Sequence, residues 1–307
     1  MTERTQIRNS ALFVGQVLWD RVVRVDHVPV DDEKVTAIEA VDRAGGNAFV
    51  AALACAQVGF IPDVISGIGN DVPGQMIEGS LKSRGAFWHP RLMEKTPCAT
   101  ILVNPRGRAI ISPPDKERNE YLQDFPLLDI EGCRIVHIDG TQFDAAEHYV
   151  REAVRLGVPV SCDFGRARPG IKDLLPHIVF PGLSERCAKE LYGGVDNALE
   201  ELRKHSLEGV VTLGSEGLRF FKGKEPIRHL PAPRIPAELV VDTNGAGDVF
   251  HGARVAAYLQ WPDKALEYRL WFASCAAGSK IQHFDDYLPD REDVHLTMRH
   301  CGVRAVG

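Results

Sequence analysis

Residues 242–248 read Asp-Thr-Asn-Gly-Ala-Gly-Asp and lie between a short apolar run, 239–241, and an apolar-periodic segment that reaches Leu259. This order predicts a strand, a glycine-bearing turn and a helix. The Gly245-Ala246-Gly247 turn leaves backbone N–H groups free where the helix begins, and the helix dipole adds partial positive charge there. We therefore expect this turn to bind a phosphate or a developing oxyanion.

Asp248 lies in the first turn of the predicted helix, and two roles are open to its carboxylate. It can cap the free amides of the helix, or it can face a bound hydroxyl and act as a general base. A Gly-x-Gly turn alone does not decide between a cap and a catalyst.

The composition is that of a globular protein whose partners are small molecules. The chain has 307 residues, of which 44% are hydrophobic and 25% are charged, so it can bury a large core. Because the net charge is −6, we expect neither a nucleic-acid partner nor an anionic membrane surface. The seven cysteines are scattered and form no Cys-x-x-Cys pair, which predicts reduced thiols and a cytoplasmic location.

The second half of the chain alternates apolar strands with helical segments, which predicts an α/β fold with a mostly parallel sheet and helices on both faces. We expect strands at 134–138, 158–162, 177–180 and 209–213, and helices at 145–156, 184–191 and 197–205. Ligands bind beyond the carboxyl ends of such strands, where four polar or small residues fall: Asp139, Asp163, Ser184 and Gly214.

The first half combines one more α/β unit with a small separate sheet. A strand at 63–66, a turn at 67–71 and a helix at 74–83 form the unit, with Asp71 as the helix cap. Alternating runs at 21–26 and 34–41, with a hairpin of 99–103 and 108–111, form the small sheet. Between them, Gly45-Gly46-Asn47 opens an Ala-rich helix that continues to about Val58, where small residues let the backbone approach a ligand or another helix.

Three of these strings resemble motifs of the ribokinase-like (PfkB) carbohydrate kinases. Residues 242–248 resemble the family signature Asp-Thr-x-Gly-Ala-Gly-Asp, and Gly45-Gly46-Asn47 resembles the segment that opens the family's first major helix. Residues 212–217 resemble its Thr-x-Gly-x-x-Gly loop. The resemblance covers the whole chain and implies a single ribokinase-like domain over residues 1–307, with lid strands inserted from about 16–42 and 97–112.

The resemblance also implies an activity and a set of site residues. The expected reaction is the ATP-dependent phosphorylation of a hydroxyl of a ketohexose or related sugar, with Mg²⁺ and with Asp248 as the general base. Gly245, Ala246 and Gly247 would form the anion hole. The expected acceptor contacts are Asp20, Lys34, Gly45, Gly46, Asn47 and Arg108, and the expected nucleotide contacts are Ser184, Thr212, Gly214, Gly217, Asp242, Thr243 and Ala277. No residue is predicted as a direct metal ligand, and a homodimer through the lid is expected.

The chain departs from the family at two places. Ser184-Glu185-Arg186-Cys187 stands where many members carry Asn-x-x-Glu, a substitution reminiscent of ketohexokinases and sulfofructose kinases. Residues 280–289 lack the usual Gly-Ala near a monovalent-cation loop, which leaves a potassium requirement open.

The sequence leaves the acceptor, and even catalysis itself, open. Lys34 resembles the lysine that sulfofructose kinases aim at a sulfonate, but Ser112 and Thr141 stand where two further anion contacts would be. A nucleoside kinase on the same fold and a non-catalytic sugar sensor are both compatible with these motifs. A nicotinamide-dependent oxidoreductase would need Gly-x-Gly-x-x-Gly after the first strand, and residues 15–20 do not supply it.

Overall fold

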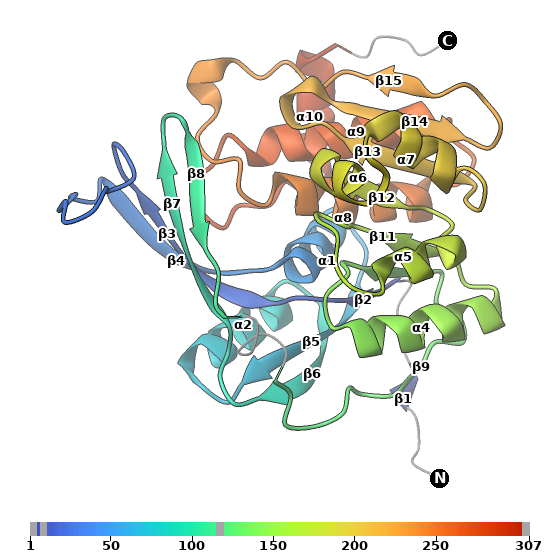
Figure 1. The fold of residues 1–307 in the computed structure, drawn as a ribbon, viewed down its shortest axis with the longest axis horizontal. Helices are drawn as coiled ribbons and strands as arrows, with labels where there is room; N and C mark the ends of the chain where they lie inside the picture. Colours follow the sequence, from blue (N-terminus) through green and yellow to red (C-terminus); the bar gives the residue numbers. More distant parts are fainter. Residues whose placement is uncertain (1–4, 7–10, 115–119, 303–307) are drawn as a thin grey trace.

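A five-stranded parallel sheet forms the centre of the molecule (Figure 1). The computed structural model describes residues 5–6, 11–114 and 120–302. The strand order is β11 (Val160–Cys162), β10 (Ile135–Ile138), β2 (Ala11–Val14), β5 (Pro62–Gly69) and β6 (Phe87–Met93). All four residues of β2 are buried, as expected for a central strand covered on both faces.

A second sheet continues the first along its β11 edge. It contains β12 (Gly182–Ser184), β13 (Glu208–Thr212), β14 (Leu218–Lys222) and β15 (Arg228–Leu230), of which only β12 and β13 are parallel to each other. Backbone bonds from Phe164 N to Gly182 O and from Ser184 N to Phe164 O join the two sheets. The carboxyl ends of their parallel strands therefore share one edge.

Helices cover both faces of the sheet. Phe13 of β2 packs in a core with α1 (Asn47–Gln57), α8 (Ala246–Gln260) and α9 (Leu266–Lys280). Its neighbour Leu12 packs in the opposite core with α4 (Phe143–Leu156), α6 (Glu185–Tyr192) and α7 (Val195–Leu202). The remaining elements are α2 (Val72–Ser83), α5 (Ile171–Leu174), α10 (Arg291–His300) and the short pair β1 (Thr5–Gln6) and β9 (Leu128–Asp129). The predicted α/β fold is confirmed.

A separate four-stranded sheet, called the lid below, projects from this body (Figure 1). Its strand order is β4 (Glu39–Gly45), β3 (Leu18–Arg24), β7 (Cys98–Asn104) and β8 (Gly107–Ile111). Val22, Ile101 and Val103 of the lid pack on Phe284 of the body.

Two predictions from the first half were wrong in their bounds. The strand expected at 34–41 is β4, which begins at Glu39 and ends at Gly45, because antiparallel pairing with β3 runs from Arg24–Glu39 to Leu18–Gly45. The turn expected at 67–71 is shorter, because β5 stays paired with β6 through Gly69. Asp71 caps α2, as predicted, and accepts a hydrogen bond from Gly74 N.

Two predictions from the second half were wrong in kind. The strand expected at 177–180 is reduced to a single parallel bridge between Phe180 and Ser161, because a 3₁₀ turn, Leu175–His177, that contains Pro176 occupies its start. The next strand begins at Gly182. Residues 239–241 are not a strand, because a 3₁₀ turn, Ala237–Leu239, follows Pro236. The amides of Val241 and Asp242 bond instead to the carbonyl of Ile281.

No helix among the described residues is both long enough and apolar enough to cross a bilayer.

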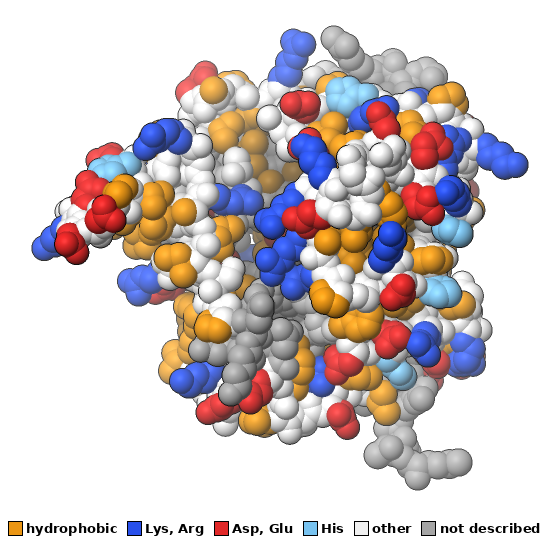
Figure 2. Space-filling model, in the orientation of Figure 1, with side chains coloured by type: hydrophobic (Ala, Val, Ile, Leu, Met, Phe, Trp, Pro, Cys, Tyr) orange, Lys and Arg blue, Asp and Glu red, His pale blue; other side chains and the backbone are white. Residues whose placement is uncertain are grey.

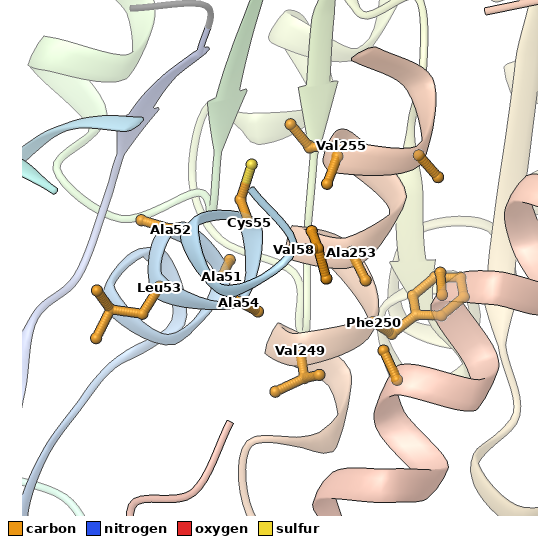
Figure 3. Packing of buried hydrophobic residues seen from close by; sticks show 14 of the residues in the cluster. Ala51, Ala52, Leu53, Ala54, Cys55, Val58, Val249, Phe250, Ala253 and Val255 are labelled. Carbon is orange, nitrogen blue, oxygen red and sulfur yellow. The ribbon is translucent and has the colours of Figure 1, made fainter. Parts of the chain in front are cut away.

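Helices α1 and α8 pack in direct backbone contact (Figure 3). A Cβ atom added at Gly252 of α8 would lie 2.0 Å from the carbonyl oxygen of Ala51 in α1. Only glycine allows this approach, and it brings the beginnings of the two helices to the same place.

We predict that Gly252→Ala lowers the free energy of unfolding by about 1–3 kcal/mol, because the added methyl meets backbone atoms that cannot rotate away. The matched control is Gly79→Ala in α2, where the added Cβ has no atom within 4 Å. That exposed site should gain about 0.5–1 kcal/mol of stability. Urea unfolding measures both changes, and equal effects at the two sites would show that the helices do not touch at Gly252.

Candidate active site

A cleft of about 260 Å³ opens between the lid and the carboxyl ends of the central strands. Figure 2 shows the hollow between lid and body, with Lys and Arg side chains at its mouth. Six residues singled out from the sequence line this cleft together: Asp20, Gly45, Gly46, Asn47, Gly245 and Asp248. They come from the lid, from the start of α1 and from the start of α8.

The start of α8 presents free backbone amides. Gly245, the residue before the helix, has a φ of 77°, a left-handed conformation that favours glycine. The amide of Ala246 donates to the carbonyl of Thr243 at 3.4 Å. The amides of Gly247 and Asp248 donate to no other group in the described part of the chain. An anion at this helix start would meet two unsatisfied donors and the positive end of the dipole.

The carboxylate of Asp248 faces the cleft and does not cap its own helix. The side-chain amide of Asn47 hydrogen-bonds to Asp248 and also to Asp163, which follows β11. On the far side, Nε2 of the buried His251 lies 3.5 Å from Oδ1 of Asp163. The base candidate is thus held by a chain of buried and half-buried polar groups, which fixes its orientation.

Burial raises the pKa of Asp248 to about 6, and the nearby carboxylate of Asp139 adds to this rise. The guanidinium of Arg108 and the hydrogen bond from Asn47 act in the opposite direction. A carboxyl with this pKa is ionised at neutral pH and is basic enough to take up a proton, as a general base requires.

Asp20 of β3 lies beside the Gly45-Gly46 segment. A Cβ atom at Gly45 would lie 2.2 Å from Oδ2 of Asp20, so the carboxylate needs glycine at this position. Burial raises the pKa of Asp20 to about 7, Arg43 opposes the rise, and the charges of Asp248 and Asp242 add to it. Two carboxyl groups of raised pKa thus line the same cleft.

The two basic lid residues expected at the acceptor do not line the cleft. Nη1 of Arg108 lies 3.3 Å from Oγ1 of Thr243 and so reaches the turn before α8. Lys34 is exposed in the segment between β3 and β4, where its ammonium meets water.

The residues expected on the nucleotide side lie at the carboxyl ends of β12 and β13 and along α9. Thr212 ends β13, Gly214 begins the next turn with a φ of 60°, and Ala277 is half-buried in α9. Ser184 is engaged within the protein, because Oγ accepts from Cys187 N and donates to Gly165 O. Gly217 packs tightly on the carbonyl of Leu230, which explains the glycine without a ligand.

Asp242 is also engaged within the protein. It is buried, and its carboxylate pairs with Arg43 and accepts from the amide of Asn244. Both of its carboxylate oxygens therefore accept from donors within the protein.

Five basic residues at the cleft escaped the sequence analysis: Arg43, Arg84, Arg166, Arg168 and Lys280. Arg166 and Arg168 are half-buried in the loop after β11, and neither forms a hydrogen bond or ion pair with another described residue. The sequence could have indicated Arg166 and Arg168, because their loop follows the strand that ends before Asp163, and ligands bind beyond such strand ends. Arg43 stands two residues before Gly45, on the strand whose bounds were mispredicted.

Within the described ranges, no group of three or more His, Cys, Asp or Glu residues is arranged to hold a metal ion. Mg²⁺ in phosphoryl-transfer sites is usually held by substrate phosphates, water and only one or two carboxylates. Such a site would leave no metal-binding cluster in the protein alone.

The chain is similar in fold and in sequence to ribokinases. A solved structure of Arabidopsis thaliana ribokinase, complexed with ribose and ATP, superposes with a TM-score of 0.80 at 24% identity, covering 95% of this chain and 99% of that one. The chain is also 28% identical to a ribokinase of Arabidopsis thaliana, over 92% of this chain and 79% of that protein. It is 28% identical to an ATP-dependent ribose-1-phosphate kinase of Halopiger xanaduensis, over 87% and 91% of the two chains.

Residues 8–292 match the pfkB family of carbohydrate kinases. The chain belongs to this family, and it is an ATP-dependent carbohydrate kinase.

We predict that kcat/KM for the acceptor falls as the pH drops through the range from about 7 to about 6, because a raised pKa leaves Asp248 protonated below it. Asp20 titrates in the same cleft, so the measured limb belongs to the coupled pair. Arg108→Gln should move the limb to higher pH, since it removes a positive charge that lowers the pKa of Asp248.

The matched control is Arg106→Gln in the same lid hairpin, whose side chain is exposed. A pH–rate profile of the three proteins measures the shift. A profile that is flat between pH 5 and 8, or one that Arg106→Gln moves as far, would contradict the assignment.

Proposed function

We propose that the cleft transfers the γ-phosphoryl group of ATP to a hydroxyl of a ketohexose or related small sugar, with Asp248 as the general base. One observation carries this proposal: the carboxylate of Asp248 faces the cleft beside two free amides at the start of α8. These are the amides of Gly247 and Asp248, which donate to no described group. A base and an anion site at one helix start are what in-line phosphoryl transfer requires.

In the proposed reaction the sugar oxygen forms a bond to the γ-phosphorus while the bond between that phosphorus and the bridging oxygen breaks. The proton of the hydroxyl passes to Asp248, and ADP leaves. Charge on the transferring group is stabilised by the anion hole of Gly245, Ala246 and Gly247, in which the amide of Gly247 donates to no described group. Mg²⁺ bound to the phosphates would neutralise further negative charge.

The acceptor would lie between Asp20, the Gly45-Gly46 segment and Asn47. Asn47 gives its amide protons to Asp163 and Asp248, which leaves its carbonyl oxygen for a sugar hydroxyl. Asp20 would accept from a second hydroxyl. On the nucleotide side we retain Thr212, Gly214, Thr243 and Ala277 as contacts, and we assign Ser184, Gly217 and Asp242 to the support of that side.

A sugar that already carries a phosphate or another anionic group is a second candidate acceptor. It is favoured by Arg166 and Arg168, two guanidinium groups in the cleft that pair with no described residue. The relative from Halopiger xanaduensis bears the name of a kinase for such a sugar. Lys34, whose resemblance to a sulfonate-binding lysine suggested an anionic acceptor, lies away from the cleft.

We further propose a cytoplasmic homodimer that meets through the lid. Exposed apolar side chains gather there, among them Val30, Ile38, Ile110 and Ile111. All seven cysteines are free thiols, in keeping with a reducing compartment. Light scattering would show twice the 33.9 kDa mass of one chain, and a monomer would overturn the dimer.

We predict that Asp248→Asn lowers kcat by about 10²- to 10⁴-fold, because the amide cannot take the proton of the hydroxyl. ATP binding, measured by calorimetry, should be unchanged. The control is Asp196→Asn, which alters an aspartate in the first turn of α7 and should keep full turnover. An Asp248→Asn enzyme with wild-type turnover would refute the base.

We predict that an acceptor panel assayed by ADP release separates the candidates. Fructose and ribose, their monophosphates, sulfofructose, inosine and adenosine would be compared at equal concentration. Neutral sugars should be phosphorylated under the first proposal, whereas a preference for anionic sugars that Arg168→Gln abolishes would support the second. Preference for inosine or adenosine would indicate a nucleoside kinase, and sugar binding without ADP release would indicate a sensor.

A further inference from the structure

A buried ion pair holds the turn that leads into the anion hole. Nη2 of Arg43 lies 2.8 Å from Oδ2 of Asp242, and the two side chains are only 7% and 1% exposed. The other carboxylate oxygen of Asp242 accepts from the amide of Asn244 at 2.8 Å. Gly245 follows directly, so this carboxylate fixes the turn from which the free amides of α8 project.

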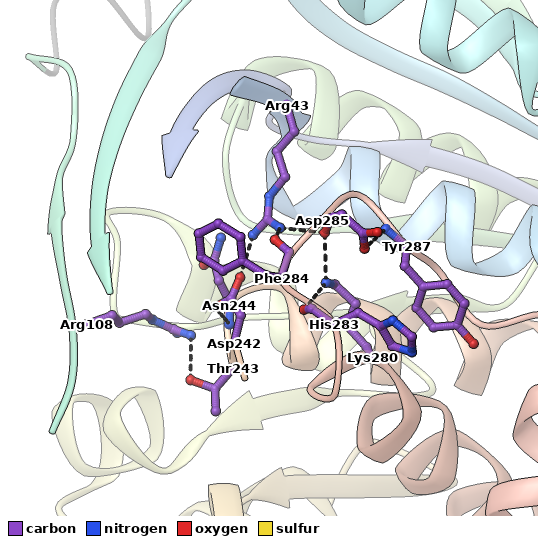
Figure 4. Close-up of polar contacts among 10 residues, drawn as sticks. All are labelled: Arg43, Arg108, Asp242, Thr243, Asn244, Lys280, His283, Phe284, Asp285 and Tyr287. Atoms are coloured by element: carbon purple, nitrogen blue, oxygen red, sulfur yellow. Dashed lines mark hydrogen bonds and ion pairs between the residues drawn. The ribbon is translucent and has the colours of Figure 1, made fainter. Parts of the chain in front are cut away.

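The same guanidinium holds a second loop, residues 283–285, after α9 (Figure 4). Nη1 of Arg43 donates to the carbonyl of Phe284 at 2.7 Å and to that of Asp285 at 2.6 Å. Nζ of Lys280 donates to the carbonyls of His283 and Asp285 at 3.3 and 3.2 Å. Three carbonyl oxygens and one carboxylate therefore surround two cationic groups of the protein itself.

Carbonyl and carboxylate oxygens in such a cluster are the donor set that a hard cation from solution would take. Here the donors already point at the nitrogen atoms of Arg43 and Lys280. A free cation would have to displace one of these groups and would lie a few ångströms from the other, where repulsion between like charges is strong. The residues present do not fit an exchangeable monovalent cation.

Arg43 also joins the two sides of the cleft. It belongs to β4 of the lid, two residues before Gly45, while Asp242 belongs to the turn before the anion hole. Its planar fork donates to three oxygen atoms from two segments in a fixed geometry, which the ammonium of a lysine does not provide. The geometry of the phosphoryl site thus depends on a residue next to the acceptor site.

We propose that Arg43, assisted by Lys280, is a built-in cation that positions the 242–244 turn and the adjoining amides of α8, so that catalysis needs no potassium or other monovalent cation. Arg43 is a positioning residue, since it contacts Asp242 and the 283–285 loop and acts on the reaction through them. The inference rests on the proposed role of those amides in phosphoryl transfer.

The first test uses the wild-type enzyme. Rates at saturating ATP and acceptor would be compared in potassium chloride, sodium chloride and tetramethylammonium chloride at equal ionic strength. We expect the rates to agree within about twofold, because the oxygen donors are already occupied. Activation by potassium of about tenfold or more would overturn the proposal. If Asp248→Asn were inactive in the same assay, the proposed function would survive that outcome.

The second test replaces Arg43 by alanine. Loss of the contacts of Arg43 with Asp242 and the 283–285 loop should misplace the amides of α8 and lower kcat by about 100-fold, with a smaller effect on KM for ATP. Potassium chloride, or guanidinium chloride far below denaturing concentrations, should restore part of the kcat. Arg43→Lys keeps the charge but loses the fork, and should retain an intermediate kcat.

The matched control is Arg269→Ala, which breaks another buried Arg–carboxylate pair, with Glu208 at 2.8 Å, in the body of the protein. Both alanine variants should lose stability, but only Arg43→Ala should gain activity from added cations. Its melting temperature should also rise in potassium chloride relative to tetramethylammonium chloride.

Two results for Arg43→Ala would show that the ion pair is structural only. The first is an unchanged kcat, and the second is a loss of kcat that no added cation restores in a folded variant. If this variant does not fold, Lys280→Met supplies the same comparison, and the wild-type salt series still decides the question.

Discussion

The close contact between α1 and α8 is the constraint on which the site depends. Because Gly252 has no side chain, the backbone of α8 reaches the carbonyl of Ala51, and the first residues of both helices arrive at the same edge of the sheet. Asn47 can then bond to Asp248, and the free amides of α8 face the space under the lid. The packing of two apolar helices thus positions both the base and the anion site.

Acidic and basic groups line the cleft together. The carboxyl groups of Asp20 and Asp248 both have a raised pKa, and burial is the main cause of the rise for each. Arginines lie around them: Arg43 is paired with Asp242, whereas Arg166 and Arg168 pair with no residue that the structure describes. These two cations suit a ligand that brings its own negative charge, as ATP or a phosphorylated sugar does.

The sequence allowed the α/β fold and the helix-start site to be predicted because both are local patterns. Each pattern can be recognised from a few neighbouring residues: Gly245, the apolar helix after it, and the Gly45-Gly46-Asn47 string. Strand bounds were less predictable, because β4 is fixed by its pairing with β3 and not by its own alternation. The expected strand at 239–241 failed for a similar reason, since the amide of Val241 bonds to the carbonyl of Ile281, which is distant in the sequence.

The roles of single charged residues were the least predictable part of the site. Arg43 and Asp242 are 199 positions apart in the sequence. The residues around each of them do not indicate that the two form an ion pair. Lys34 lies in a short acidic stretch that looked like part of a strand, yet it is exposed outside the cleft. Pairing with residues distant in the sequence decides which charges are left to act on a ligand, and a local sequence pattern does not reveal such pairing.

The central claim is that the carboxylate of Asp248 and the neighbouring amides of α8 both face the reacting atoms. A crystal structure with ADP, aluminium fluoride and the sugar that the enzyme phosphorylates would test it most directly. The account predicts a carboxylate oxygen of Asp248 about 2.6–3.2 Å from the attacking hydroxyl, and the amide of Gly247 bonded to the fluoride group. A hydroxyl held by another residue, with the carboxylate of Asp248 bonded to its own helix, would contradict it.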